Sequence, residues 1–268
     1  MDDNRIFTLE NHWGCARIAA HGAQLLTCTT ADGKPLFWCE KDPDLSDGSA
    51  IRGGIPICWP WFGQHLTDPE QPMHGVVRLH RWQCQLLENT AAESRLILTG
   101  DFCGAQLQME YRLNDGLELH LSFTNQTAAP IVYSGAFHSY FAVADTRRIT
   151  VGGLDGLTYL SRPEDIHYRQ AGDLAFTGDR LTRVYESGVR QAVVTDPEWQ
   201  RQIRITPIHT DAVVVWNPGA GSGQNIQGLE PGDEDRFVCV ETVIPRGFER
   251  PLPPGSTGRL GTRIEILP

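Results

Sequence analysis

The feature that most constrains the fold of this chain is a two-residue alternation of apolar and polar side chains. Apolar residues occupy every second position from Leu107 to Leu113 and again from Leu117 to Phe123, and an Asn-Asp-Gly turn signal separates the two runs. Because successive side chains of a strand point to opposite faces, this pattern predicts a β-hairpin with one buried face.

Further strands are expected along the rest of the chain. The same β pattern occurs in five other segments: Arg95–Thr99, Gln202–Ile205, Ala212–Trp216, Arg236–Val243 and Arg263–Leu267. The stretch Cys15–Thr29 is broken near Gly22, which predicts two strands or one bulged strand. The tail 246–257 is rich in proline and glycine and is expected to lead into one last strand.

The sequence contains few segments that favour an α-helix. No segment of 12 or more residues has the 3.6-residue period of an amphipathic helix, and short helical turns fit only around 43–46 or 163–167. The 27 glycines and 17 prolines interrupt most longer runs. We therefore expect an all-β chain, with a single domain over residues 1–268 folded as a large antiparallel β-sandwich.

The charge balance bears on the class of partner. The formal net charge is −10, so the chain has no excess of positive charge for nucleic acid or an anionic membrane surface. A small anionic ligand held by local arginines is not excluded. All the basic residues except Lys34 and Lys41 are arginine, whose planar fork suits phosphate.

Cysteine usage and the N-terminus point to the cytoplasm. The seven cysteines are scattered without a CxxC pair, which favours reduced thiols over disulfides. The first residues are polar and acidic and do not resemble a signal peptide, and no run of 18 apolar residues occurs. We expect a cytoplasmic protein that does not enter a membrane.

Residues 51–63 form the most unusual segment. They combine Arg52, a Gly-Gly pair, prolines and three aromatic residues in thirteen positions. Glycine permits close backbone approach, proline opposes regular pairing, and aromatic faces can stack on sugar rings or bases. A buried irregular loop at one end of a sheet has the same composition, so composition leaves both interpretations open.

Two histidines lie in contexts that also admit two interpretations. His74 and Arg78 flank a short glycine-containing stretch and could both point into a cleft or could be solvated loop residues. With His80 they match no common zinc pattern. His138 lies among aromatic residues, where burial keeps an imidazole neutral yet able to transfer a proton. A hydrogen-bonded core histidine is the alternative there.

Glu241 lies inside an apolar β segment and needs an explanation. Strand alternation places it on one face with Phe237, Cys239 and Val243, and both faces are mainly apolar. Burying a carboxylate costs several kcal/mol unless it is paired or protonated. Either a structural ion pair with an arginine or a functional carboxyl group would account for it.

Taken in order, these segments resemble a known family. The motifs that carry the resemblance are Arg52-Gly53-Gly54-Ile55-Pro56, Cys58-Trp59-Pro60-Trp61-Phe62-Gly63, His74-Gly75-x-x-Arg78, His138-x-Tyr140-Phe141, Trp216-Asn217-Pro218 and Phe237-Val238-Cys239-Val240-Glu241. They are similar to the aldose 1-epimerase (mutarotase) superfamily and, within it, to the hexose-6-phosphate mutarotase branch with its glucose-6-phosphate 1-epimerases. The resemblance runs from about residue 15 to about residue 243.

The resemblance implies a galactose-mutarotase-like supersandwich and a set of site residues. The family's catalytic pair corresponds to His138 and Glu241. Its sugar-phosphate contacts correspond to Arg52 and Arg78, and His74 matches another pocket position.

The chain departs from the family at two positions. Where the family often has Asp in an Asp-x-x-Tyr segment, this chain has Thr182, and Asp179 is the expected substitute in substrate binding. Met73 stands where some members have Gln. Both changes bear on the choice of sugar.

The implied activity is interconversion of the α and β anomers of a hexose 6-phosphate, with glucose 6-phosphate as the expected substrate. General acid–base catalysis through the open-chain aldehyde needs no metal or cofactor. We expect a monomer whose only partner is the small sugar phosphate. Two alternatives are a mutarotase for free aldoses and a carbohydrate-binding protein without turnover, although a matched acid and base argues against the second.

Overall fold

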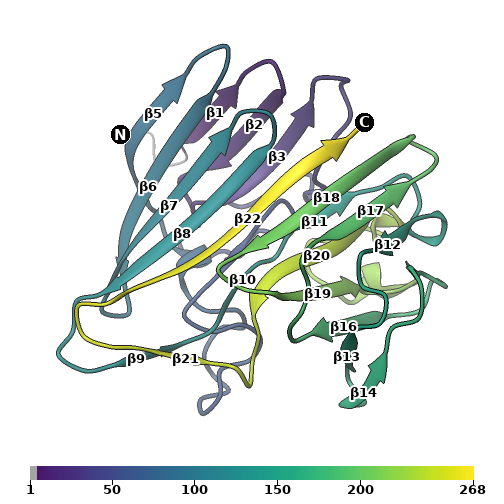
Figure 1. Ribbon diagram of the computed structural model, residues 1–268. Helices are drawn as coiled ribbons and strands as arrows, with labels where there is room; N and C mark the ends of the chain where they lie inside the picture. Colours follow the sequence, from purple (N-terminus) through teal and green to yellow (C-terminus); the bar gives the residue numbers. More distant parts are fainter. Residues whose placement is uncertain (1–4) are drawn as a thin grey trace.

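The computed structural model describes residues 5–268, except the side chain of Gln224, and every paired strand in its four sheets is antiparallel. The nine-stranded sheet forms one layer (Figure 1). In spatial order its strands are β15 (Leu174–Ala175), β12 (Thr150–Gly152), β17 (Ala192–Asp196), β18 (Arg201–Ile208), β22 (Thr257–Leu267), β8 (Leu117–Asn125), β7 (Ala105–Leu113), β6 (Ser94–Phe102) and β5 (Gln83–Asn89).

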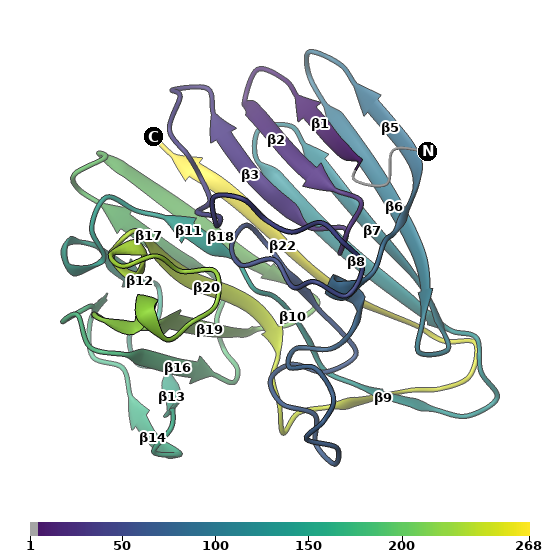
Figure 2. The same ribbon diagram turned by 180° about the vertical axis from the view of Figure 1, so that it is seen from behind.

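The three-stranded and eight-stranded sheets lie on one side of this layer, as the reverse view shows (Figure 2). The eight-stranded sheet contains β14 (Ile166–Arg169), β13 (Thr158–Ser161), β16 (Leu181–Tyr185), β19 (Ala212–Asn217), β20 (Phe237–Ile244), β10 (Gly135–Phe137), β4 (Ile57–Cys58) and β11 (Tyr140–Ala142), which pairs with β20. The two smaller sheets are built from β1 (Ile6–Glu10), β2 (Gly14–Ala19) and β3 (Leu25–Thr30), and from β9 (Ile131–Tyr133) and β21 (Arg250–Leu252).

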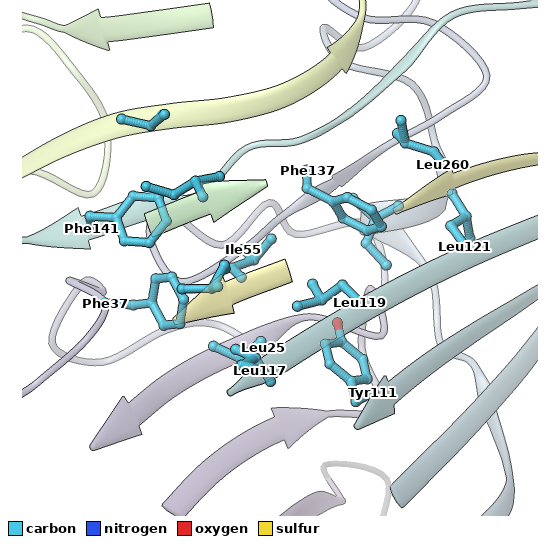
Figure 3. Close-up of a cluster of buried hydrophobic side chains, with 14 of the residues drawn as sticks. Leu25, Phe37, Ile55, Tyr111, Leu117, Leu119, Leu121, Phe137, Phe141 and Leu260 are labelled. Carbon is cyan, nitrogen blue, oxygen red and sulfur yellow. The ribbon is translucent and has the colours of Figure 1, made fainter. Parts of the chain in front are cut away.

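The hydrophobic core fills the space between these layers. Figure 3 shows Phe137 next to Leu121 and Leu260, which come from β8 and β22 of the nine-stranded sheet. Phe37 and Phe141 pack nearby with their ring centroids 5.2 Å apart. Burial of large apolar side chains on facing sheets provides the main stabilisation of such a sandwich.

The structure confirms the strand predictions. The alternating runs form β7 and β8, and Leu113 pairs with Leu117 across the predicted turn. The other five segments lie in β6, β18, β19, β20 and β22. Cys15–Thr29 gives two strands, β2 and β3, with a register shift beside Arg17. The tail carries β21 before the last strand, which starts at Thr257.

Helical structure is scarce, as expected, but its positions were not anticipated. Among residues 5–268 the helical segments are four 3-10 turns: η1 (Val77–Leu79), η2 (Thr146–Arg148), η3 (Ser222–Gln224) and η4 (Asp233–Asp235). Neither predicted helical turn forms: residues 43–46 lie in a loop, and 163–165 make the turn before β14. No helix in the described part of the chain is long and apolar enough to cross a membrane.

The alternating side-chain directions of β10, β11 and β20 determine which residues face the core and which face the site. Phe137 and Phe141 face the main core, and so do Val238 and Val240 on the opposite side of β20 from Cys239. Cys239 instead belongs to a separate cluster with Phe237 and Tyr140. The face of β20 that carries Glu241 is therefore free to line a cavity.

Candidate active site

A cavity of about 1060 Å³ lies on this face of the eight-stranded sheet. Its floor is formed by side chains of neighbouring strands, namely Thr182, Val184, Val214, Trp216 and Glu241. Loop residues between 40 and 52, between 62 and 78, and at 226–227 form much of the remaining walls, and Arg162, Arg180 and Arg246 also line the cavity. His138, Glu241, Arg52, His74 and Arg78 all line this one cavity.

Strand register brings His138 and Glu241 together although 103 residues separate them (241 − 138 = 103). Phe137 pairs with Thr242 at the end of β10, and Tyr140 pairs with Cys239 at the start of β11. The short segment between β10 and β11 therefore lies opposite Glu241. The His138 Nδ1 and the Glu241 Oε1 are 3.6 Å apart, and the two side chains are 11% and 2% exposed.

Both members of the pair keep polar atoms without partners. The His138 Nδ1 and the Glu241 Oε2 are buried and have no hydrogen-bond partner in the described structure. The polar side chain nearest to the Glu241 carboxyl group is His138 and not an arginine. The arginine ion pair considered from the sequence is thus not formed. Unsatisfied buried polar atoms at this depth are costly and are typical of a site that awaits a ligand.

Burial shifts the two pKa values in opposite directions. It lowers the pKa of His138 well below the usual imidazole value, and the neighbouring His74, Arg52 and Arg78 act in the same direction. Burial also raises the pKa of Glu241 well above that of an ordinary carboxyl group. The favoured state pairs a neutral imidazole with a protonated carboxyl group, so one partner can donate a proton while the other accepts one.

Aromatic rings fix the orientation of His138. Its ring stacks on Tyr140 at 4.8 Å with an interplanar angle of 11°, and meets the Trp216 ring edge-on at 5.8 Å. The His74 ring lies 5.3 Å away, also edge-on. These contacts restrict rotation of the imidazole and hold its nitrogens toward the cavity and Glu241.

Arg52 enters the cavity from the glycine-rich segment. Its backbone N–H donates to the Glu40 carboxylate at 2.7 Å, and its Nη1 donates to the Tyr140 hydroxyl at 3.2 Å. Gly54 has a φ of +58°, and a Cβ there would collide with the Leu25 carbonyl oxygen. The glycines are therefore required for the close approach that places Arg52. Both interpretations of residues 51–63 apply, because the buried loop also delivers a site residue.

Arg78 approaches the cavity from η1. Its Nη2 donates to the Met73 carbonyl oxygen at 2.8 Å, whereas its buried Nε has no partner in the structure described. A guanidinium group carries five N–H donors. Most donors of Arg78 are thus left for a ligand.

His74 is a neutral side chain that accepts a hydrogen bond. The Gly63 backbone N–H donates to its Nδ1 at 3.2 Å, so that nitrogen carries no proton. Burial and the charges of Arg78 and Arg52 lower the pKa of His74 to about 3. The proton of the neutral ring therefore resides on Nε2, which is available to donate to a ligand oxygen.

The His74→Asn variant should lose part of the acid sensitivity of folding. Asparagine tolerates the left-handed backbone at this position, where φ is +67°. Between pH 6.5 and the folded pKa of about 3, unfolded His74 binds a proton that folded His74 does not. Wild-type stability should therefore fall as the pH falls, by up to about 1.4 kcal/mol per pH unit from this group.

Urea unfolding at several pH values between 7 and 4 measures this effect. His138 and Glu241 titrate in both proteins, so the difference between wild type and His74→Asn isolates His74. The variant should lose stability less steeply as the pH falls. Parallel curves for the two proteins would show that His74 is protonated in the folded state.

Asp179 is the predicted site residue that the structure does not bring to the cavity. It is exposed, its carboxylate accepts the Thr177 hydroxyl at 2.9 Å, and it does not line the cavity. The cause is strand alternation, because Arg180, Thr182 and the other even-numbered residues of this stretch face inward. The prediction that Asp179 lies in the substrate cavity is therefore wrong.

Several cavity residues were not identified from the sequence. Glu40 and Gln227 hold Arg52 through its backbone N–H and its Nε, and both line the cavity. Tyr140 and Trp216 lay within recognised motifs but had no assigned role. Glu40 and Gln227 lie in loops far from each other along the chain, and no local pattern marks them.

Comparisons with known proteins identify the family and the fold. The sequence pattern of the family described as "Aldose 1-epimerase" matches residues 5–265. Relatives from Salmonella typhimurium and Escherichia coli are each 28% identical, over 91% of this chain and 84% of theirs, and each bears the name "Putative glucose-6-phosphate 1-epimerase".

Solved structures show the same fold. A crystallised protein from Salmonella typhimurium, described as "a putative mutarotase", superposes with a TM-score of 0.90 at 25% identity, covering 99% of this chain and 91% of that one. A "galactose mutarotase related enzyme" from Lactobacillus acidophilus has a TM-score of 0.72 at 13% identity, with 98% of each chain covered, and supports the fold alone. Its all-β fold, its mutarotase-like architecture and the family match over residues 5–265 show that this chain belongs to the aldose 1-epimerase family.

Proposed function

We propose that this protein interconverts the α and β anomers of a hexose 6-phosphate, with glucose 6-phosphate as the expected substrate. The observation that supports this most directly is the His138–Glu241 pair, 3.6 Å apart with buried polar atoms unpartnered, in a cavity that also holds Arg52 and Arg78. The names of the relatives support the same substrate.

The reaction needs one proton removed and one delivered. A proton first passes from Glu241 to His138, whose Nδ1 lies 3.6 Å from the Glu241 Oε1, and this converts the neutral pair to a carboxylate and an imidazolium. Glu241 then takes the proton of the C1 hydroxyl while His138 protonates the ring oxygen, which opens the ring to the aldehyde. Rotation about C1–C2 and closure on the other face return both protons. The same two groups exchange roles between opening and closing, so the pair ends as it began.

Substrate charge can assist this proton transfer. The positive charges of Arg52 and Arg78 contribute to lowering the pKa of His138. A phosphate group bound by both arginines neutralises them and raises that pKa, which favours the imidazolium needed for ring opening. The phosphate thereby serves the chemical step as well as binding.

The arginines of the cavity also explain how a negatively charged protein can attract a sugar phosphate. A protein of charge −10 gains nothing from its overall field when a sugar phosphate approaches. Charge-assisted hydrogen bonds from two guanidinium groups must supply the attraction locally. Arg52 and Arg78 line the cavity together and keep free donors.

The test is an anomer-interconversion assay with pure α-glucose 6-phosphate, followed by polarimetry or NMR, with glucose and galactose as comparison substrates. The proposal expects fast conversion of the phosphorylated sugar. Faster turnover of a free aldose would favour a mutarotase for unphosphorylated sugars. No turnover of any of the three, with sugar phosphate still bound, would favour a binding protein.

Chelators and mild reductants should not lower the rate. The acid–base route requires no metal ion, and the seven cysteines are free thiols. The measurement compares the rate before and after dialysis against EDTA, and with and without a thiol reductant. A rate abolished by EDTA and restored by a divalent ion would contradict this mechanism.

A further inference from the structure

A third potential metal ligand lies beside the acid–base pair. One ligand atom each from His138, Cys239 and Glu241 lies within 4.8 Å of the others, and all three residues are buried. Cys239 and Glu241 are two positions apart on β20 and so share a face of that strand. The acid–base mechanism gives no role to this thiol.

The donor set matches the coordination chemistry of zinc. Imidazole nitrogen, thiolate sulfur and carboxylate oxygen are the three ligand types of Zn²⁺ in proteins. With metal–ligand distances of about 2.0–2.3 Å, donors of a tetrahedral zinc lie about 3.5 Å apart. The His138 Nδ1 and Glu241 Oε1 are already 3.6 Å apart, so a shift of roughly an ångström closes the set.

Two further observations favour a cation here. The buried His138 Nδ1 and Glu241 Oε2 have no hydrogen-bond partner among the described residues, so ligation would satisfy atoms that the fold leaves unsatisfied. The Cys239 thiol and the Glu241 carboxyl group release their protons to solvent when the ion binds, and the resulting thiolate and carboxylate balance its double charge, as a buried site requires. The positive charges of Arg52 and Arg78, which act on His138, weaken binding of the ion.

We propose that His138 and Glu241, which line the cavity, form an inhibitory Zn²⁺ site together with the buried Cys239 beside them. Three protein ligands leave the fourth tetrahedral position to water or another small ligand. Coordination occupies the lone pair of the imidazole and the carboxylate, so neither group can transfer a proton while zinc is bound. Zinc therefore inhibits turnover of the sugar. This inhibition rests on the proposed function, whereas the binding of zinc to the protein does not.

Cobalt is the probe for binding, because Co²⁺ occupies tetrahedral zinc sites and a thiolate ligand gives it a near-ultraviolet charge-transfer band. The full-length protein, treated with EDTA and freed of chelator, should develop this band with one equivalent of Co²⁺ and lose it on adding Zn²⁺. Cys239→Ser should abolish the band. Cys28→Ser, which changes an equally buried thiol on β3, should retain it.

The inhibition arm measures the anomer-interconversion rate against Zn²⁺ concentration. Loss of a residue that only hydrogen-bonds to a metal ligand typically lowers metal affinity 10–100-fold. Loss of the Cys239 ligand should therefore raise the half-inhibiting zinc concentration at least about tenfold, and EDTA should reverse inhibition of the wild type. Mg²⁺ should not inhibit, because it prefers oxygen ligands.

A second variant tests the site in case Cys239→Ser does not fold. Glu241→Gln keeps the side-chain size and should weaken Co²⁺ binding while retaining the thiolate band at saturating metal. A band that persists in Cys239→Ser, or no band in the folded wild type, would overturn the site. A cobalt band in a protein that turns over no sugar would uphold the site and refute the proposed function instead.

Discussion

Glu241→Gln and His138→Asn should each lower the rate of anomer interconversion by about 10²–10⁴, the usual contribution of a positioned general acid or base. Both substitutions remove the proton transfer and keep a side chain of similar size. The fold should survive, because the His138 Nδ1 and the Glu241 Oε2 make no hydrogen bond that the substitution would break. Removing an ionisable group from a buried position also removes a cost of folding.

The rate is measured with glucose 6-phosphate by NMR, and folding is checked by thermal unfolding. Glu110→Gln is a matched control, since Glu110 is a buried glutamate on β7 that is paired with Arg95 and Arg112 outside the cavity. It should lose stability but keep the rate. A near-normal rate in folded Glu241→Gln or His138→Asn would remove that residue from the mechanism.

Most of the fold follows from local sequence patterns. Alternation from Leu107 to Phe123 predicts a hairpin because one face must be buried and the turn residues fix the register. The same reasoning predicts the two faces of β20, including Glu241. Helical turns are harder to predict, since three residues of 3-10 helix such as η1 leave no periodic signal. The turn at 163–165 formed a hairpin instead, because β13 and β14 pair across it.

The site depends on contacts that no local pattern encodes. His138 and Glu241 were paired from the resemblance, and the register of β10 and β20 supplies the physical reason for their proximity. Whether Asp179 faces the cavity depends on whether the odd-numbered or the even-numbered side chains around β16 face inward, and one short strand gives no sequence signal for that choice. Gln227 contacts Arg52 from a loop 175 residues away in sequence, a separation over which sequence patterns carry no geometric information.

The second large effect concerns recognition of the phosphate. Arg78→Ala and Arg52→Ala should each lower kcat/KM for a sugar phosphate by roughly 10-fold to 150-fold. A hydrogen bond to a charged group contributes about 1.5–3 kcal/mol, and that free energy converts to the rate ratio directly. The activity of Arg78→Ala on an unphosphorylated sugar should change much less, because that sugar lacks the group that the arginine holds.

The two variants should differ in a way that the structure specifies. Arg52 also donates a hydrogen bond to the hydroxyl of Tyr140, whose ring stacks on His138. Arg52→Ala should therefore lower kcat as well, whereas Arg78→Ala should act mainly through KM. Arginine-to-lysine variants should recover part of the loss, since lysine keeps the charge without the fork. Arg204→Ala on β18, whose partner is Glu265, is the control and should leave kcat/KM unchanged. Equal losses on phosphorylated and free sugars would show that Arg52 and Arg78 support the cavity generally and do not select phosphate.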